Sequence, residues 1–83
     1  MKYRINKLCG INNLSVRFDK EFDDEFINKL IKILDNFEIK EKDKESVWLK
    51  LGEKDVLIYK HGEILFLGFS EDDVKNILDK VLK

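Results

Sequence analysis

The sequence has few of the residues from which most catalytic and metal sites are built. Its 83 residues include one cysteine and one histidine. A single cysteine excludes an internal disulfide and a cysteine-rich zinc site. A single histidine leaves no credible Ser–His–Asp or Cys–His catalytic set. The sequence therefore makes an enzyme the weakest functional class, and it predicts neither a metal nor a cofactor.

An excess of charge of one sign is also missing, because 16 basic and 17 acidic residues give a net charge of -1. This balance excludes a general basic footprint for nucleic acid, although it leaves room for a local patch. The longest apolar runs, such as residues 64–69, fall far short of the ~20 residues of a membrane span. The first ten residues also lack the apolar core of a signal peptide. We expect a cytoplasmic protein without a membrane partner.

The hydrophobic fraction of 43% is enough for one core, so we predict a single domain over residues 1–83. The most informative stretch is residues 55–82, where a β-hairpin runs directly into an amphipathic helix. Side chains alternate across a strand, so the hairpin has two faces. One face carries Val56, Ile58, Ile64 and Phe66, and the other carries Leu57, Tyr59, Leu65 and Leu67.

Both faces of this predicted hairpin are therefore apolar. Between its strands, Gly62 supplies the positive φ that a tight turn needs, and His61 is expected to be a solvated turn residue. An antiparallel sheet with helices on one side normally presents a polar face to water. The second apolar face therefore predicts a contact surface.

The other elements follow from the hydrophobic period. Residues 11–18 alternate as a strand with one buried face; residues 3–8 are read as an extension of this strand, with Gly10 marking a bend or bulge. A helix of about three and a half turns follows Asp23. Residues 38–45 form either a charged edge strand, which we favour, or a loop, and residues 47–51 form another strand. Ser70 is the expected N-cap of the last helix, in a capping-box pattern with Asp73.

These elements predict an α+β fold in the order β-α-β-β-β-β-α. Two helices cover one face of an antiparallel sheet of four to five strands, and the other face is open. Cys9 is expected to be a buried small hydrophobe. The core is predicted to contain Val16, Phe26, Leu30, Leu34, Leu49, Ile58, Phe66, Ile77, Leu78 and Val81.

This pattern resembles one repeat of the TATA-binding protein family, which sets two such units side by side as a curved saddle. The likeness is clearest in DVLIYKHGEILFLGFSEDDVKNIL. There a strand ending in the aromatic Tyr59 precedes a turn with Gly62, a second strand closes at Gly68, and an acidic cap follows at Ser70. The segments LSVRF and FDDEFINKLIKIL resemble the first strand and helix of the family repeat, so the likeness covers nearly the whole chain.

The resemblance implies that the concave sheet face binds the minor groove of DNA, where apolar side chains, an Asn and two wedging Phe residues act in the family. Tyr59 matches one wedge position, but the other falls near Lys44, and Leu67 replaces a small hydroxyl residue. The base-contacting Asn matches either Asn12 or Asn13. Because of these departures, we expect any nucleic-acid binding to be weak.

The predicted function is a non-enzymatic interaction module that acts through the helix-free face of the sheet. Three occupants remain open: a second copy in a homodimer, which we favour, another protein, or nucleic acid as the alternative. Trp48 and Tyr59 are aromatic anchors or stacking groups. Candidate phosphate contacts are Arg17, Lys50 and Lys60. The candidate binding residues are Asn13, Arg17, Trp48, Lys50, Leu57, Tyr59, Leu65 and Leu67.

Overall fold

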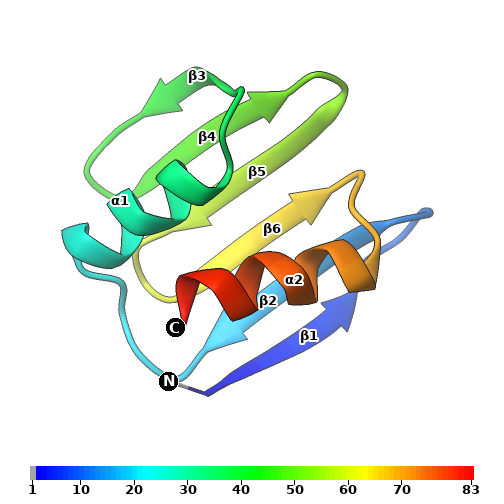
Figure 1. Ribbon diagram of the computed structural model, residues 1–83, viewed down its shortest axis with the longest axis horizontal. Coiled ribbons are helices and arrows are strands. Elements are labelled where there is room, and N and C mark those ends of the chain that lie inside the picture. The colour runs from blue at the N-terminus through cyan, green and yellow to red at the C-terminus, as the bar shows by residue number, and fades with distance from the viewer. Residues whose placement is uncertain (1) are drawn as a thin grey trace.

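The computed structural model describes residues 2–83 and has two layers, a sheet and a pair of helices (Figure 1). Six antiparallel strands lie side by side in the order β1-β2-β6-β5-β4-β3. Both helices cover the same face of this sheet and contact each other. The elements are β1 Tyr3–Lys7, β2 Asn13–Phe18, α1 Asp24–Ile33, β3 Glu38–Lys42, β4 Ser46–Leu51, β5 Lys54–Tyr59, β6 Glu63–Leu67 and α2 Glu71–Val81.

The predicted α+β class is confirmed, but the expected four to five strands are wrong, because the sheet has six. The additional strand is β1, which was read as an extension of the following strand. Instead the chain reverses between the two, with positive φ at Gly10 (93°) and Asn12 (60°). Strand β1 then pairs antiparallel with β2, from Tyr3 opposite Phe18 to Lys7 opposite Leu14. The bend expected at Gly10 is therefore a complete hairpin turn.

The C-terminal hairpin has the two faces that the sequence predicts. The side chains assigned to the core face, Val56, Ile58, Ile64 and Phe66, are fully buried. The side chains of the opposite face, Leu57, Tyr59, Leu65 and Leu67, are partly exposed. The register places Ile58 opposite Ile64 and Leu57 opposite Leu65, so each face continues across both strands.

Gly62 in the β5–β6 turn has a φ of 115°, and a Cβ built there would lie 2.6 Å from the backbone oxygen of Lys20. Gly52 in the β4–β5 turn also has positive φ (65°), but nothing lies within 4 Å of its Cβ position. We therefore expect Gly62→Ala to lower the free energy of unfolding by about 2–3 kcal/mol. Gly52→Ala should lower it by only about 1 kcal/mol. Urea unfolding of both variants checks this order, and equal losses would contradict the close approach at Gly62.

Both helices begin at capping residues, and Ser70 of the second helix was predicted as one from the sequence. The Asp23 carboxylate accepts a hydrogen bond from the backbone N–H of Phe26 (2.8 Å), and the Ser70 hydroxyl accepts one from that of Asp73 (3.2 Å). Helix α1 has ten residues, which is shorter than the predicted three and a half turns. It stops because Asn36 adopts a positive φ of 55° just beyond its C-cap.

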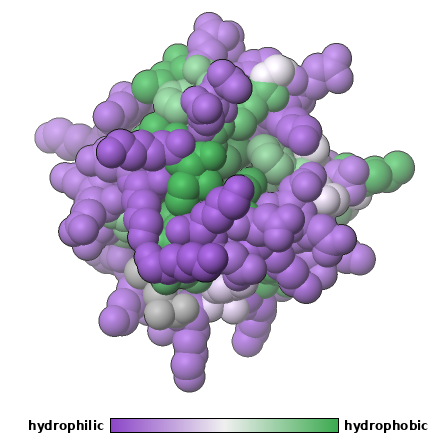
Figure 2. Space-filling view, in the orientation of Figure 1, coloured by the Kyte–Doolittle hydropathy of each residue, from purple (hydrophilic) through white to green (hydrophobic). Residues whose placement is uncertain are grey.

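The core lies between the sheet and the helices, largely as predicted. Phe26 and Ile77 are exceptions, since they pack against the core but remain partly exposed. The members of the predicted core that are buried are Val16, Leu30, Leu34, Leu49, Ile58, Phe66, Leu78 and Val81. Figure 2 shows the helix side of the molecule, where hydrophilic side chains surround a hydrophobic area in the middle.

The favoured reading of the charged segment as an edge strand is confirmed by β3, all of whose residues are exposed. Its pairing with β4 is interrupted by a register shift between Ile39 and Glu41. Charges and irregular pairing both discourage an edge strand from adding another chain. Within residues 2–83, no helix is long and apolar enough to cross a membrane.

Candidate interaction surface

The face of the sheet that the helices do not cover, here called the open face, has an apolar centre. Its register places Trp48 of β4 opposite Leu57 of β5, and Leu57 opposite Leu65 of β6. Leu67 and Tyr59 continue this centre along the same two strands. Trp48 is 37% exposed, and the other four side chains are partly exposed. The five apolar residues therefore form one continuous area across three strands.

All eight predicted binding residues belong to strand positions that point to this face. They come from β2, β4, β5 and β6, and each alternates with a buried core neighbour such as Leu14, Val16 or Leu49. The sequence therefore placed these side chains on the correct side of the sheet. Whether they bind a partner stays a prediction.

A polar contact fixes the orientation of the tryptophan. The indole Nε1 of Trp48 donates a hydrogen bond to Oδ1 of Asp55 at 2.9 Å, and Nζ of Lys50 lies 3.5 Å from the same oxygen. The Asp55 carboxylate thus neutralises Lys50 and satisfies the indole at once. An aromatic side chain held in one orientation loses less conformational entropy when a partner covers it.

A second polar group borders the apolar centre on the β2 side. Glu63 accepts a hydrogen bond from the Ser15 hydroxyl at 2.9 Å, and it lies 3.6 Å from Nε of Arg17 and 3.4 Å from Nε2 of His61. Partial burial by itself would raise the pKa of Glu63. The hydrogen bond from Ser15 and the neighbouring Arg17 and His61 outweigh it, so the pKa is lowered. Glu63 is therefore an anion at neutral pH and compensates the charge of Arg17.

Two other predicted side chains have local contacts. The ring of Tyr59 stacks on that of His61 with centroids 5.7 Å apart, which orients the tyrosine at the edge of the apolar centre. Asn13 donates from Nδ2 to the backbone oxygen of Cys9 (2.9 Å) and accepts at Oδ1 from the N–H of Gly68 (3.2 Å). Asn13 thus ties the β1–β2 turn to the end of β6.

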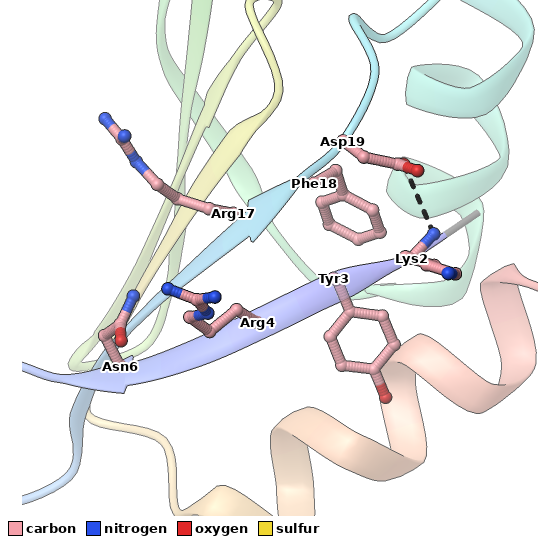
Figure 3. Close-up of a pocket in the computed structure, with 7 residues that line it drawn as sticks. All are labelled: Lys2, Tyr3, Arg4, Asn6, Arg17, Phe18 and Asp19. Atoms are coloured by element: carbon pink, nitrogen blue, oxygen red, sulfur yellow. Dashed lines mark hydrogen bonds between the residues drawn. The ribbon is translucent and has the colours of Figure 1, made fainter.

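Sequence reasoning missed Arg4 and Asn6, which lie on β1 next to the open-face residues of β2. Arg4 is directly opposite Arg17, and Asn6 is opposite Ser15. In Figure 3 the side chains of Arg4, Asn6 and Arg17 extend from one side of the two strands, whereas the rings of Tyr3 and Phe18 extend from the other. An open cavity of about 420 Å³ adjoins these residues. The alternation in YRINK could have revealed them if this segment had been assigned its own place at the sheet edge.

The expectation for Cys9 is wrong, because this residue is exposed in the β1–β2 turn. The β1–β2 turn extends beyond α2 (Figure 1), so a side chain in this turn does not reach the core. His61 is a solvated turn residue, as predicted, with 60% of its side chain exposed. Among residues 2–83, no group of three or more His, Cys, Asp or Glu residues could hold a metal ion.

Comparisons of the chain with protein-family models, with curated proteins and with solved structures give no match. The resemblance to a TATA-binding-protein repeat accordingly stays a prediction from the sequence.

Proposed function

We propose that the protein is a non-enzymatic interaction module whose open face binds a flat apolar surface of a protein, and that this partner is a second copy of the chain. The single observation that carries the proposal is the apolar area formed by Trp48, Leu57, Tyr59, Leu65 and Leu67. A solvated sheet face would show polar residues at these positions. Five contiguous apolar side chains gain stability when another surface removes them from water.

The charges of the open face favour a protein over a nucleic acid. Arg17 is compensated by Glu63, and Lys50 by Asp55, within the sheet itself. Compensated pairs attract neither a phosphate backbone nor any other strongly charged ligand. They do suit the rim of a protein interface, where polar groups surround an apolar centre.

A second copy also fits the charges at the two ends of the face. Arg4 lies on β1 at one edge, and Glu41 lies opposite Trp48 on β3 at the other, whereas Glu38 is already paired with Lys40 at 3.4 Å. A twofold axis parallel to the strands places β1 of one copy over β3 of the other. The edge that carries Arg4 in each copy then faces the edge that carries Glu41 in the other, while the apolar centres face each other. This arrangement supports the choice of a second copy as partner.

The size of the face sets the expected strength of this contact. Six strands about 4.8 Å apart, each about 17 Å long, give roughly 500 Å² per copy, or about 1,000 Å² in total. That area is at the low end of specific interfaces. We therefore expect weak and reversible association. Light scattering from micromolar to millimolar concentration tests it, with a rising mass expected; a mass of one chain throughout would contradict the proposal.

Nucleic acid is the second candidate, favoured by one observation: Arg4 and Arg17 lie side by side on the face that carries Tyr59. If the chain binds duplex DNA, the affinity should be low and should fall steeply with salt, because phosphate contacts would supply most of it. Fluorescence anisotropy with TATA-containing and scrambled duplexes at two salt concentrations measures this. A strong preference for TATA at physiological salt would overturn this expectation and favour sequence readout by the open face.

A further inference from the structure

The two edges of the sheet differ in how well they are protected from pairing with another chain. Strand β3 presents four charged residues among five, and its register shifts at Ile39. Strand β1, YRINK, pairs with β2 without any shift along its whole length. Edge strands are normally blunted by charges, bulges or proline. Strand β1 carries two charges, Arg4 and Lys7, but it has neither a register shift nor a proline. Of the two edges, β1 is therefore the more regular one and the better suited to add a strand.

The backbone of β1 also has free hydrogen-bonding groups in a regular pattern. The N–H of Leu8 donates to the oxygen of Asn13, and the oxygen of Lys2 accepts from the N–H of Asp19. In an antiparallel pair, alternate residues direct both backbone groups toward the neighbouring strand. The even-numbered residues of β1 therefore bond to β2, and Tyr3, Ile5 and Lys7 direct their N–H and C=O groups to the open edge.

We propose that β1 pairs antiparallel with β1 of a second copy, about a twofold axis at Ile5. In this register Ile5 faces Ile5 of the second copy, and Tyr3 faces Lys7 of the second copy. Tyr3, Ile5 and Lys7 then each exchange backbone hydrogen bonds with a residue of the second copy whose N–H and C=O also point to the open edge. Arg4 faces the uncharged Asn6 of the second copy, so no like charges lie directly opposite each other.

Neighbouring registers are worse for reasons that can be read from the strand. A twofold axis at Arg4 would place two arginines directly opposite each other, which is destabilising. An axis at Asn6 would leave Tyr3 without a partner inside the strand, and an axis at Lys7 would oppose two lysines. An axis that passes between two residues would place a residue whose N–H and C=O point to the open edge opposite one whose N–H and C=O already bond to β2. The sequence YRINK therefore selects the register centred on Ile5.

This contact is separate from the proposed function, because it uses an edge of the sheet and not its open face. The twofold axis of strand pairing is perpendicular to the sheet, so both helical layers lie on one side and the two open faces adjoin. The twofold axis of face-to-face packing is parallel to the strands and lies between the two sheets. One axis passes through Ile5 at the edge of the sheet and the other runs along the middle of the sheet, so the two axes do not intersect. Both contacts together would therefore extend into an open filament and would not close a symmetric tetramer.

Amide hydrogen exchange measured by NMR distinguishes strand pairing from any other association. The amides of Arg4 and Asn6 should be protected at every protein concentration, because they bond to β2. Those of Tyr3, Ile5 and Lys7 should exchange fast in dilute solution and at least tenfold more slowly at millimolar concentration. If these three amides exchange at the same rate throughout, the proposal is wrong.

Two substitutions of one exposed residue provide a matched pair. Both are made in a chain that also carries Leu65→Lys and Leu67→Lys, because Asn6 lies on the open face and the face contact would otherwise respond to its charge. Asn6→Arg places an arginine opposite Arg4 of the second copy, twice in each dimer, and should weaken pairing roughly tenfold; Asn6→Glu should strengthen it severalfold. Circular dichroism confirms that both variants keep the fold. Equal dimer dissociation constants for the two variants would overturn the proposal.

A variant of the open face separates this proposal from the proposed function. Leu65→Lys combined with Leu67→Lys removes the face contact but leaves β1 intact. The concentration-dependent protection of the Ile5 amide should therefore persist in this variant. Its loss would assign the protection to the face contact and contradict strand pairing.

Discussion

Phe66→Ala is expected to lower the free energy of unfolding by ~3–5 kcal/mol. Phe66 is fully buried, and its ring meets that of Phe69 edge to face with centroids 5.4 Å apart. Removing the ring leaves a cavity in the core that the surrounding side chains fill only in part. Urea unfolding followed by circular dichroism measures the loss.

The matched control is the preceding residue on the opposite face of the same strand. Leu65 is only partly buried, so Leu65→Ala should cost about 1 kcal/mol, because part of its surface is already in water. The strand and its backbone pairing are the same in both variants. Equal losses would mean that the open face is covered in the monomer, and the assignment of the two faces would be wrong.

The double variant Leu65→Lys and Leu67→Lys is expected to lose the face contact while it stays folded. Each lysine would enter the apolar centre of the interface, where a buried and unpaired charge is strongly unfavourable. In the isolated monomer, both side chains can reach water along the open face. Light scattering at millimolar concentration should then give a lower mass than that of the unmodified chain.

The control adds the same two charges elsewhere. Ile11 is 88% exposed in the β1–β2 turn, and Asn76 is exposed on α2. Ile11→Lys combined with Asn76→Lys should leave the mass unchanged. If light scattering gives the same lowered mass for both double variants, the added net charge explains the loss of association. If the Leu65 and Leu67 variant unfolds, the face is part of the core.

The features that the sequence predicted well depend on local signals. The β5–β6 hairpin follows from Gly62 between two strands of period two, and the start of α2 follows from Ser70 and Asp73. Neither signal requires knowledge of distant parts of the chain. The assignment of Ile58 to the core face and Leu57 to the open face followed from the alternation alone.

The errors concern pairing between segments, which the period of a single strand does not determine. The alternation of Tyr3, Ile5 and Lys7 fits a strand, but it does not say whether the chain continues or reverses at Gly10. The pairing of Tyr3 with Phe18 decides this. The same error hid Arg4 from the candidate surface. The burial of Cys9 was expected from its residue type alone. Cys9 lies in the β1–β2 turn, where its side chain is exposed and does not reach the core.

Trp48 allows the most direct test of the central claim, that the open face is where copies of the chain meet. It is the only tryptophan in the sequence, and it lies on the open face across the sheet from β1. Acrylamide quenching of its fluorescence should be followed from micromolar to millimolar concentration beside light scattering. We predict that quenching falls as the mass rises, because the second copy covers the indole. Quenching that stays constant while the mass rises would contradict the account, since the copies would then meet elsewhere.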